Sequence, residues 1–258
     1  MNIAGSAPNH FVTDKGDAVI LDGGARTGRF VIVCEHGGKE IPVGMGDLGL
    51  TPDELESHVA WDPGAASVAC EVAKQLDSPL VLQRYSRLIY DCNRPPTSDD
   101  AMRTVSETTQ ISGNQNLSSQ EKLWRTEHIY EPFHASVDDE LEKRDHPVLI
   151  TVHSFTPIYH GNKRAVGVGI LHDEDSRLAD AMLANQKFDD GVIVARNDPY
   201  GPEDGVTHTL QLHTQGTDYL NVMVEIRNDL IDAKASQKHY ADQLVETIKA
   251  AIKSLERK

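Results

Sequence analysis

The stretch "RFVIVCEHGGKEIP", residues 29–42, begins as an apolar run and ends among charged side chains. Its centre, residues 31–33, is continuously apolar rather than alternating, which is the pattern of a strand buried on both faces of a sheet. Glu35 and His36 follow directly, and two glycines remove side-chain bulk beside them. Such an ending has two interpretations: a metal site at the end of a buried strand, or a solvated turn.

The same kind of apolar run recurs along the chain, with helical patterns between the runs. The further strand candidates are residues 79–84, 87–92, 147–153, 165–172, 191–196 and 221–227. The helical patterns cover residues 62–77, 118–144, 173–187 and 232–258. Pro132 should kink or divide the second helical pattern. This alternation predicts an α/β fold with a mostly parallel or mixed central sheet and helices on both faces.

Two stretches fall outside this pattern. Residues 1–28 begin without a basic start or an apolar signal region, and we expect them to form a weakly ordered leader. Residues 97–117 form a long polar stretch, which is either a surface excursion near a functional site or a mobile loop.

Length and composition restrict the class of protein. A chain of 258 residues suits one large domain over residues 1–258. The formal charge of −15 argues against nucleic acid or an anionic membrane as a partner, so an anionic ligand would have to meet local arginines. Three cysteines without paired spacing, together with the lack of a signal peptide or a membrane-spanning run, favour a cytoplasmic protein. Nothing in the sequence indicates an oligomeric state.

Polar residues follow five of the predicted strands where each strand ends. The carboxyl ends of parallel strands meet at one edge of a sheet, and open α/β folds bind ligands there. A solvated turn explains each case singly, but two histidines, a glutamate and several arginines at one edge favour a shared site. These residues are Glu35-His36, Asn93-Arg94, His153-Ser154, Arg196-Asn197 and Glu225 with Arg227.

His36 and His153 are the natural pair of metal ligands at this edge. Imidazole nitrogens combined with a carboxylate oxygen suit a catalytic zinc site. The other histidines considered lie in helical or loop patterns and are predicted to be surface residues: His58, His128, His134, His146 and His239.

Two carboxylates compete for the third ligand position. Glu40 lies four residues after His36 and reaches the same centre if a turn begins at Gly37, where the glycines would let the backbone approach the metal or the substrate. Asp62, in "WDPGA", precedes a helix, so it either caps that helix or reaches the metal. Both residues remain open as the ligand.

Glu225 is the candidate for a general base. A period of two in residues 221–227 places Met223, Glu225 and Arg227 on one face of the strand. Burial of a carboxylate is costly unless it is paired or lies in a hydrated cleft, and burial raises its pKa towards a useful value. The alternative is a pair between Glu225 and Arg227 on an edge strand.

Six motifs follow one another along the chain: "CEHGGKEIP" (34–42), "WDPGA" (61–65), "YSRLIYDCNRPP" (85–96), "HSFTP" (153–157), "NDPY" (197–200) and "VEIRNDL" (224–230). Together they resemble the N-formylglutamate amidohydrolase family, which is related to the zinc carboxypeptidases. The resemblance implies a zinc-carboxypeptidase-like fold and a zinc-dependent hydrolase that cleaves a short N-acyl amino acid, N-formyl-L-glutamate above others, into formate and glutamate.

The resemblance also implies roles for single residues. His153 resembles the second zinc histidine and Glu225 the catalytic glutamate. His36 and Glu40 resemble a His-x-x-Glu pair with one residue too many, which keeps Asp62 as a candidate. One Zn²⁺ per chain would acidify water and polarise the scissile carbonyl. Arg87 would stabilise the oxyanion, with a salt bridge at a strand end as its alternative.

The small anionic substrate would be held by further residues. Asn93 and Arg94 would bind its α-carboxylate, since an arginine can do so with two hydrogen bonds. Arg164 and Arg196 are candidates for a second carboxylate. Ser154, Arg227 and Asn197 would contribute to the pocket, and Tyr200 would close it or simply pack in a turn. The alternatives are a metallo-deacylase or carboxypeptidase of other specificity, and a non-catalytic carboxylate-binding relative.

Overall fold

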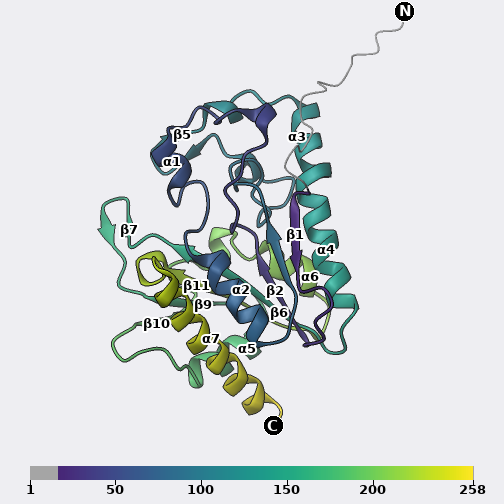
Figure 1. The fold of residues 1–258 in the computed structure, drawn as a ribbon, viewed down its shortest axis with the longest axis vertical. Coiled ribbons are helices and arrows are strands. Elements are labelled where there is room, and N and C mark those ends of the chain that lie inside the picture. The colour runs from purple at the N-terminus through teal and green to yellow at the C-terminus, as the bar shows by residue number, and fades with distance from the viewer. Residues whose placement is uncertain (1–16, 258) are drawn as a thin grey trace, which may run out of the picture.

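The computed structural model describes residues 17–257, and a seven-stranded mixed sheet forms their centre (Figure 1). Across the sheet the strands lie in the order β1 (Val19–Asp22), β3 (Leu80–Gln83), β2 (Phe30–Cys34), β6 (Val148–Phe155), β11 (Leu220–Arg227), β9 (Val168–Leu171) and β10 (Val194–Arg196). The four strands from β3 to β11 are parallel, whereas β1, β9 and β10 run against them. The predicted α/β fold with a mixed sheet is confirmed.

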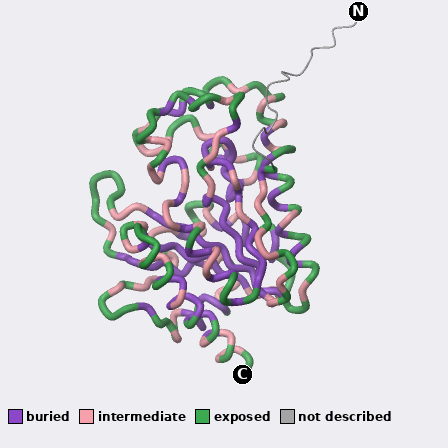
Figure 2. The backbone as a smooth tube through the Cα atoms, in the orientation of Figure 1, coloured by how far each residue is buried: buried purple, intermediate pink, exposed green. Residues whose placement is uncertain are grey.

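Helices cover both faces of the sheet, as the alternation of patterns predicts. On one face α7 (Lys234–Leu255) packs against both α2 (Ala65–Gln75) and α5 (Arg177–Ala184). On the other face lie α4 (Glu131–Glu142) and the short α6 (His208–Thr214). Figure 2 shows the sheet as the buried centre, with exposed residues on the outer sides of the helices.

The side-chain alternation of the strands decides which face carries chemistry. On β2, Ile32 packs in the core under α2 and α7, whereas Val31 and Val33 pack in the core under α4. On β11, Val224 belongs to the first core and Met223 to the second. Because the period is two, Glu225 projects on the same side as Met223. The candidate base therefore lies on the α4 and α6 side of the sheet.

Shorter elements complete the chain. The remaining helices and strands are α1 (Pro52–Glu56), α3 (Ser119–Arg125), a π-helical turn (Thr126–Tyr130), β4 (Val105–Ser106), β5 (Thr109–Gln110), β7 (Ile158–Tyr159) and β8 (Asn162–Lys163). Within residues 17–257, five 3₁₀ turns lie at residues 43–45, 99–102, 112–114, 202–204 and 228–230. Pro132 lies in the first turn of α4, directly after the π-helical turn, so the predicted division of that helix is confirmed.

Residues 87–92 do not form the predicted strand but a turn-rich connection. Their apolar side chains are fully buried, which explains the strand-like pattern. The backbone carbonyls, however, are bound by side chains instead of a neighbouring strand: Asn114 donates to the carbonyl of Leu88, and Arg125 donates to that of Ile89. A buried irregular segment is stable only when such partners satisfy its backbone.

Residues 19–22, within the predicted leader of residues 1–28, form a strand instead. Strand β1 lies within residues 1–28 and pairs with β3, so this part of the predicted leader is an edge strand of the sheet. Residues 1–16 lie outside the described residues. Within residues 17–257, no helix has the combined length and apolar character that crossing a membrane requires.

Candidate metal centre and its cavity

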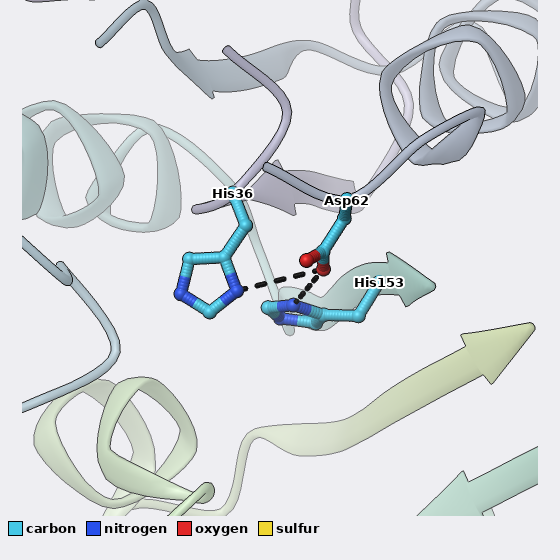
Figure 3. Close-up of side chains that lie close together, drawn as sticks. All are labelled: His36, Asp62 and His153. Atoms are coloured by element: carbon cyan, nitrogen blue, oxygen red, sulfur yellow. Dashed lines mark hydrogen bonds and ion pairs between the residues drawn. The ribbon is translucent and has the colours of Figure 1, made fainter. Parts of the chain in front are cut away.

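Three potential metal ligands converge where β2 and β6 end. His36 follows β2, His153 lies near the end of β6, and Asp62 precedes α2; Figure 3 shows the three side chains together. Their ligand atoms lie within 4.8 Å of one another. Asp62 Oδ2 is 3.0 Å from His153 Nδ1 and 3.5 Å from His36 Nδ1. All three side chains are buried, so their polar atoms face one another rather than bulk water.

Backbone contacts hold Asp62 in this cluster. Its amide donates to the carbonyl of His36 at 2.9 Å, and its carboxylate accepts from the amide of Ser154 at 3.2 Å. The N-cap position of α2 belongs to Gly64, not to Asp62. Of the two interpretations of Asp62, the geometry therefore favours a residue that reaches the cluster over a helix cap.

The two glycines after His36 serve packing. A Cβ at Gly38 would lie 1.9 Å from the carbonyl oxygen of Arg84, and one at Gly37 would lie 2.3 Å from the side chain of Leu82. Contacts this short exclude any larger residue without movement of β3 or the segment that follows it. The glycines therefore seat the turn against that strand, rather than opening a path for a metal or a substrate.

Each histidine of the cluster is backed by a buried carboxylate on its other ring nitrogen. His36 Nε2 is 2.7 Å from Asp91 Oδ1 in a hydrogen bond. His153 Nε2 is 3.0 Å from Glu35 Oε2, an ion-pair contact that is not aligned as a hydrogen bond. Metal-binding histidines are commonly oriented by carboxylates in this way, with the other nitrogen left for the metal.

The pKa shifts of Glu35 and His153 reflect how strongly the buried groups interact. Burial alone would raise the pKa of Glu35, but His153 and His36 hold it at about 2. Burial would likewise lower the pKa of His153, but Glu35 and Asp62 raise it well above its usual value. The carboxylates therefore stabilise a positive charge at His153, and the same charges would stabilise a bound cation.

The donor set fits a divalent cation such as zinc. His36 Nδ1 is buried and has no hydrogen-bond partner within residues 17–257. Two imidazole nitrogens and one carboxylate oxygen, with a further position on a cavity, are the ligands of a catalytic zinc site. Four buried acidic side chains surround the two histidines, and a cation would balance their charge. These acidic residues are Glu35, Asp62, Asp91 and Glu225.

Glu225 lies beside the cluster on the next strand. In the parallel register of β6 and β11 it is the direct partner of His153. Its side chain is buried, and its Oε2 atom has no hydrogen-bond partner in the described part of the chain. Burial raises the pKa of Glu225 to about 7, opposed by His153 and assisted by Asp62. A carboxyl group that titrates near neutral pH is suited to general-base catalysis.

A cavity of about 280 Å³ opens in front of these groups. The predicted residues that line it are His36, Asp62, Arg87, Asn93, Arg94, His153, Ser154, Tyr200 and Glu225. Arg87 donates to Asp91 Oδ2 at 2.6 Å and lies 3.6 Å from Asp62 Oδ1. Burial would lower the pKa of Arg87, but Asp91 and Asp62 raise it, so this guanidinium stays charged.

The side chains of Asn93 and Ser154 are already engaged by the protein. Asn93 accepts from the amide and hydroxyl of Thr209 and donates to the carbonyl of Val206, which fixes the start of α6. Ser154 Oγ donates to the carbonyl of Pro63. Arg94 donates one nitrogen to the carbonyls of Asn93 and Gly205. The side-chain amide of Asn93 is therefore engaged in holding the cavity wall, and it is not free to bind a substrate carboxylate as predicted.

Five predicted site residues do not join the cluster or line the cavity: Glu40, Arg164, Arg196, Asn197 and Arg227. Glu40 points away to Arg84, at 3.7 Å, because its backbone pairs with the segment after β3. Arg227 donates to Asp229 and to the carbonyls of residues 164–166, so it does not form the predicted pair with Glu225, and it does not line the cavity.

Arg196 and Asn197 follow β10, which runs against β11, so this strand ends towards the opposite edge of the sheet. Arg196 binds Asp180 and His172 at the exposed surface, and Asn197 Oδ1 accepts from the amide of His172. The prediction that five strands deliver polar residues to one edge is wrong at this strand, because it assumed a parallel direction.

The polar stretch 97–117 supplies lining residues that the sequence analysis did not single out. Arg103, Ser106 and Glu107 line the cavity, and Glu107 is held by His58 at 2.8 Å. Of the two interpretations of this stretch, the structure favours an excursion near the site. The signal in the sequence is an arginine within a polar segment that follows the "DCNR" motif closely.

The structure also buries a histidine that was predicted to lie on the surface. His134 belongs to a second histidine cluster, defined as His134, His208 and His213 on α4 and α6. His134 Nδ1 is 2.8 Å from His213 Nε2, and His134 Nε2 is 2.9 Å from the carbonyl oxygen of Cys92. An imidazole on an amphipathic helix gives no sequence signal that distinguishes its buried from its exposed positions.

Comparison with known proteins shows the family to which the chain belongs. The model of the N-formylglutamate amidohydrolase family matches residues 28–232. A crystal structure of a gene product from Agrobacterium tumefaciens is 49% identical, with a TM-score of 0.93, and the match covers 96% of this chain and 99% of that one. N-formylglutamate amidohydrolase from Ralstonia eutropha is 18% identical over 92% of this chain and 97% of its own, with a TM-score of 0.63, and shares the fold. No curated protein matches the chain in sequence. The chain belongs to the N-formylglutamate amidohydrolase family.

Proposed function

We propose that this hydrolase is a metal-dependent amidohydrolase that cleaves a short N-acyl amino acid, with N-formyl-L-glutamate as its substrate and formate and glutamate as products. The observation that carries the proposal is the position of Glu225 beside the cluster of His36, Asp62 and His153 on one cavity. Family membership supports the amide bond as the target. A cytoplasmic location, and the lack of nucleic-acid or membrane partners, stay predictions from composition.

The metal would be held by His36, Asp62 and His153, through Nδ1 of each histidine and a carboxylate oxygen. Zinc bound there would supply Lewis acidity, which polarises a carbonyl and acidifies water. The protein's part is to fix the ligands: Asp91 and Glu35 hold the two rings from behind, and their charge raises the affinity of the site for a cation.

Glu225 would move the proton. Its carboxylate removes a proton from the attacking water as the new C–O bond forms, and returns a proton to the nitrogen as the C–N bond breaks. The free amine and the carboxylic acid are then released, so atoms and charges balance. The buried position of Glu225 supports this role, because its pKa of about 7 allows both protonation states near neutral pH.

Two arginines would handle negative charge in the cavity. Arg87, held by Asp91 next to Asp62, presents a permanent positive charge where the carbonyl oxygen becomes anionic. Arg94 has a guanidinium on the cavity wall and would bind the α-carboxylate. Tyr200 and Ser154 would form part of the cavity wall, and Asn93 would hold the start of α6 beside it.

The test is release of formate from N-formyl-L-glutamate by purified protein, before and after treatment with a chelator and after addition of Zn²⁺. We expect chelation to abolish release and zinc to restore it. Glu225→Gln should reduce kcat by at least about a thousandfold while bound metal is retained, since it removes the base and not a ligand. Release that survives complete metal removal would refute the proposal, and binding without turnover would indicate a non-catalytic relative.

A further inference from the structure

Three arginines, Arg87, Arg94 and Arg103, line the cavity, and only the first two donate hydrogen bonds within residues 17–257. Arg87 donates to Asp91, and Arg94 donates to two backbone carbonyls. The guanidinium of Arg103 makes no hydrogen bond to any residue between 17 and 257, and its Nε atom is buried without a partner. A buried donor of this kind is costly unless a ligand supplies the acceptor.

The charge of Arg103 is also poorly balanced. Its nearest carboxylate oxygen is Asp91 Oδ2 at 3.7 Å, and Arg87 already binds that atom at 2.6 Å. Burial lowers the pKa of Arg103, and the nearby charge of Arg87 lowers it further, against Asp91 and Asp100. The cavity thus contains one guanidinium with unused donors, and the carboxylate that it contacts is shared with Arg87.

The backbone of Arg103 is held rigidly enough to place that guanidinium. Asn114 donates to the carbonyl of Arg103 at 2.9 Å, and Arg125 in turn donates to Asn114 at 2.8 Å. Ala101 and Ile111, on either side along the chain, are buried in the core. A receptor that is fixed before binding loses less entropy when the ligand arrives.

The other candidates for a second carboxylate are less suitable. Arg164 stacks on the rings of Tyr159 and Tyr200, at 4.5 Å and 4.8 Å, on the outer side of residues that form the cavity wall. Arg196 is exposed and bound to Asp180. Neither arginine lines the cavity.

Acidic side chains also line the cavity and would repel an anion unless they are paired. Glu107 is paired with His58 at 2.8 Å, and Asp204 accepts from the amide of Gly201 at 2.9 Å. Asp100 lines the cavity too, and no contact within 4 Å joins it to Arg103. The other acids of the cavity, Asp62 and Glu225, lie at the candidate metal centre, so the contact to Asp91 is the one ion pair of Arg103 within residues 17–257.

We propose that Arg103 is a specificity-determining residue that binds a second carboxylate of the substrate, so that the site selects N-acyl derivatives of dicarboxylic amino acids. The proposal rests on the proposed function for the assignment of the first carboxylate to Arg94. Arg94 would then bind the α-carboxylate and Arg103 the second carboxylate, while the amide bond of the substrate would lie at the cluster of His36, Asp62 and His153. A planar guanidinium with free donors can bind a carboxylate through two hydrogen bonds.

The experiment compares N-formyl-L-glutamate with N-formyl-L-glutamine, which has the same size but lacks the second charge. We expect the wild type to prefer the glutamate substrate in kcat/KM, and Arg103→Gln to reduce this preference roughly 10- to 100-fold, mainly through loss of activity on the charged substrate. Arg164→Gln is the matched control and should keep the preference. An equal loss on both substrates, or a loss of preference in Arg164→Gln instead, would overturn the proposal.

A binding measurement separates this proposal from the proposed function. Titration calorimetry of the metal-loaded protein with L-glutamate and L-glutamine needs no turnover, and the difference in Kd should disappear in Arg103→Gln. If no formyl substrate is cleaved but this difference depends on Arg103, the proposed function fails and the inference stands. If formate is released without preference for glutamate, the inference fails alone.

Arg103→Lys keeps the charge without the planar guanidinium and should lose part of the preference for glutamate. An unchanged preference in a folded Arg103→Lys or Arg103→Gln protein would contradict the role of Arg103.

Discussion

Two clusters of histidines contact residues 91–93 or their partners, and the side chains around the two clusters differ in kind. In the first, His36 and His153 direct one ring nitrogen each towards Asp62 and present the other to a buried carboxylate. In the second, the partners are a carbonyl oxygen, a phenol, another imidazole and one exposed carboxylate, that of Asp138, which lies 2.6 Å from His213 Nδ1. Tyr130 binds His208, and His134 binds both His213 and the carbonyl of Cys92.

The pKa of His153 moves in the opposite direction to the pKa values of His134 and His208. Glu35 and Asp62 outweigh burial and raise the pKa of His153. Burial and the neighbouring His213 lower the pKa of His134 to about 3 and that of His208 to about 4. A histidine thus becomes a candidate metal ligand when it shares a buried carboxylate with a second histidine, as His36 and His153 share Asp62. In the second cluster His134 contacts another imidazole and a carbonyl oxygen instead.

The largest expected difference between the clusters is in metal content. His153→Ala should lower bound zinc from about one ion per chain to less than a tenth, and reduce kcat/KM about a thousandfold, because two ligands hold a divalent ion far less tightly than three. Metal analysis of the purified proteins, together with release of formate, measures both effects.

His134→Ala is the matched control for that variant, since it also removes a buried imidazole. It should retain zinc at the level of the wild type even if its melting temperature falls. Loss of zinc in both variants would show that the second cluster supports the metal as well, and retention in both would exclude the first cluster as the site.

A smaller difference is expected in the response of stability to pH. His134 has a pKa of about 3 in the folded protein, below the ordinary value of about 6.5, and it faces His213, His208 and Glu35. Its neutral form therefore stabilises the fold fully above pH 6.5, and this contribution is lost progressively as the pH falls towards 3. From pH 7 to pH 5 the loss is about 2 kcal/mol.

His134→Gln removes this titration. At pH 7 the variant should be less stable than the wild type by about 2 kcal/mol, through a lost hydrogen bond and poorer packing. At pH 5 most of that difference should have disappeared. Urea denaturation at both values measures it, and a constant difference would show that His134 is not held neutral by its surroundings.

The smallest effect is expected for Glu40, the acid that follows His36 in sequence but not in space. Its side chain is 40% exposed and lies 3.7 Å from Arg84, so Glu40→Ala should change the free energy of unfolding by no more than about 1 kcal/mol. Zinc content should be unchanged, whereas Asp62→Ala should lose the metal. Zinc loss in Glu40→Ala would contradict the geometry of the cluster.

Much of the fold was predictable because buried parallel strands have a continuous apolar pattern. The runs that became β2, β3, β6 and β11 were correctly recognised, and His36, His153 and Glu225 were found at their ends. The failures have definite physical causes. Residues 87–92 are as buried as a strand, but side chains of Asn114 and Arg125 satisfy their backbone. Strand direction is not encoded in apolarity, so Arg196 and Asn197 were assigned to the wrong edge.

The details of the site depend on contacts between residues far apart in sequence. Sequence spacing could not decide between Glu40 and Asp62. The backbone of Glu40 pairs with Tyr85, in the segment after β3, and this pairing places the Glu40 side chain away from His36 and His153. The carboxylates behind the histidines, Glu35 and Asp91, come from different segments, and only the assembled sheet brings them to those rings. Arg103 stands out in the sequence only as an arginine in the polar stretch 97–117, and the sequence does not show that its Nε atom has no hydrogen-bond partner among the described residues.

The most direct measurement is an anomalous difference map at the zinc absorption edge, from crystals of the protein loaded with one equivalent of Zn²⁺. The account predicts a single strong peak bonded to Nδ1 of His36, Nδ1 of His153 and a carboxylate oxygen of Asp62, with Glu225 beside it and Glu40 far from it. A peak within the second histidine cluster, or no peak between His36 and His153, would contradict the account.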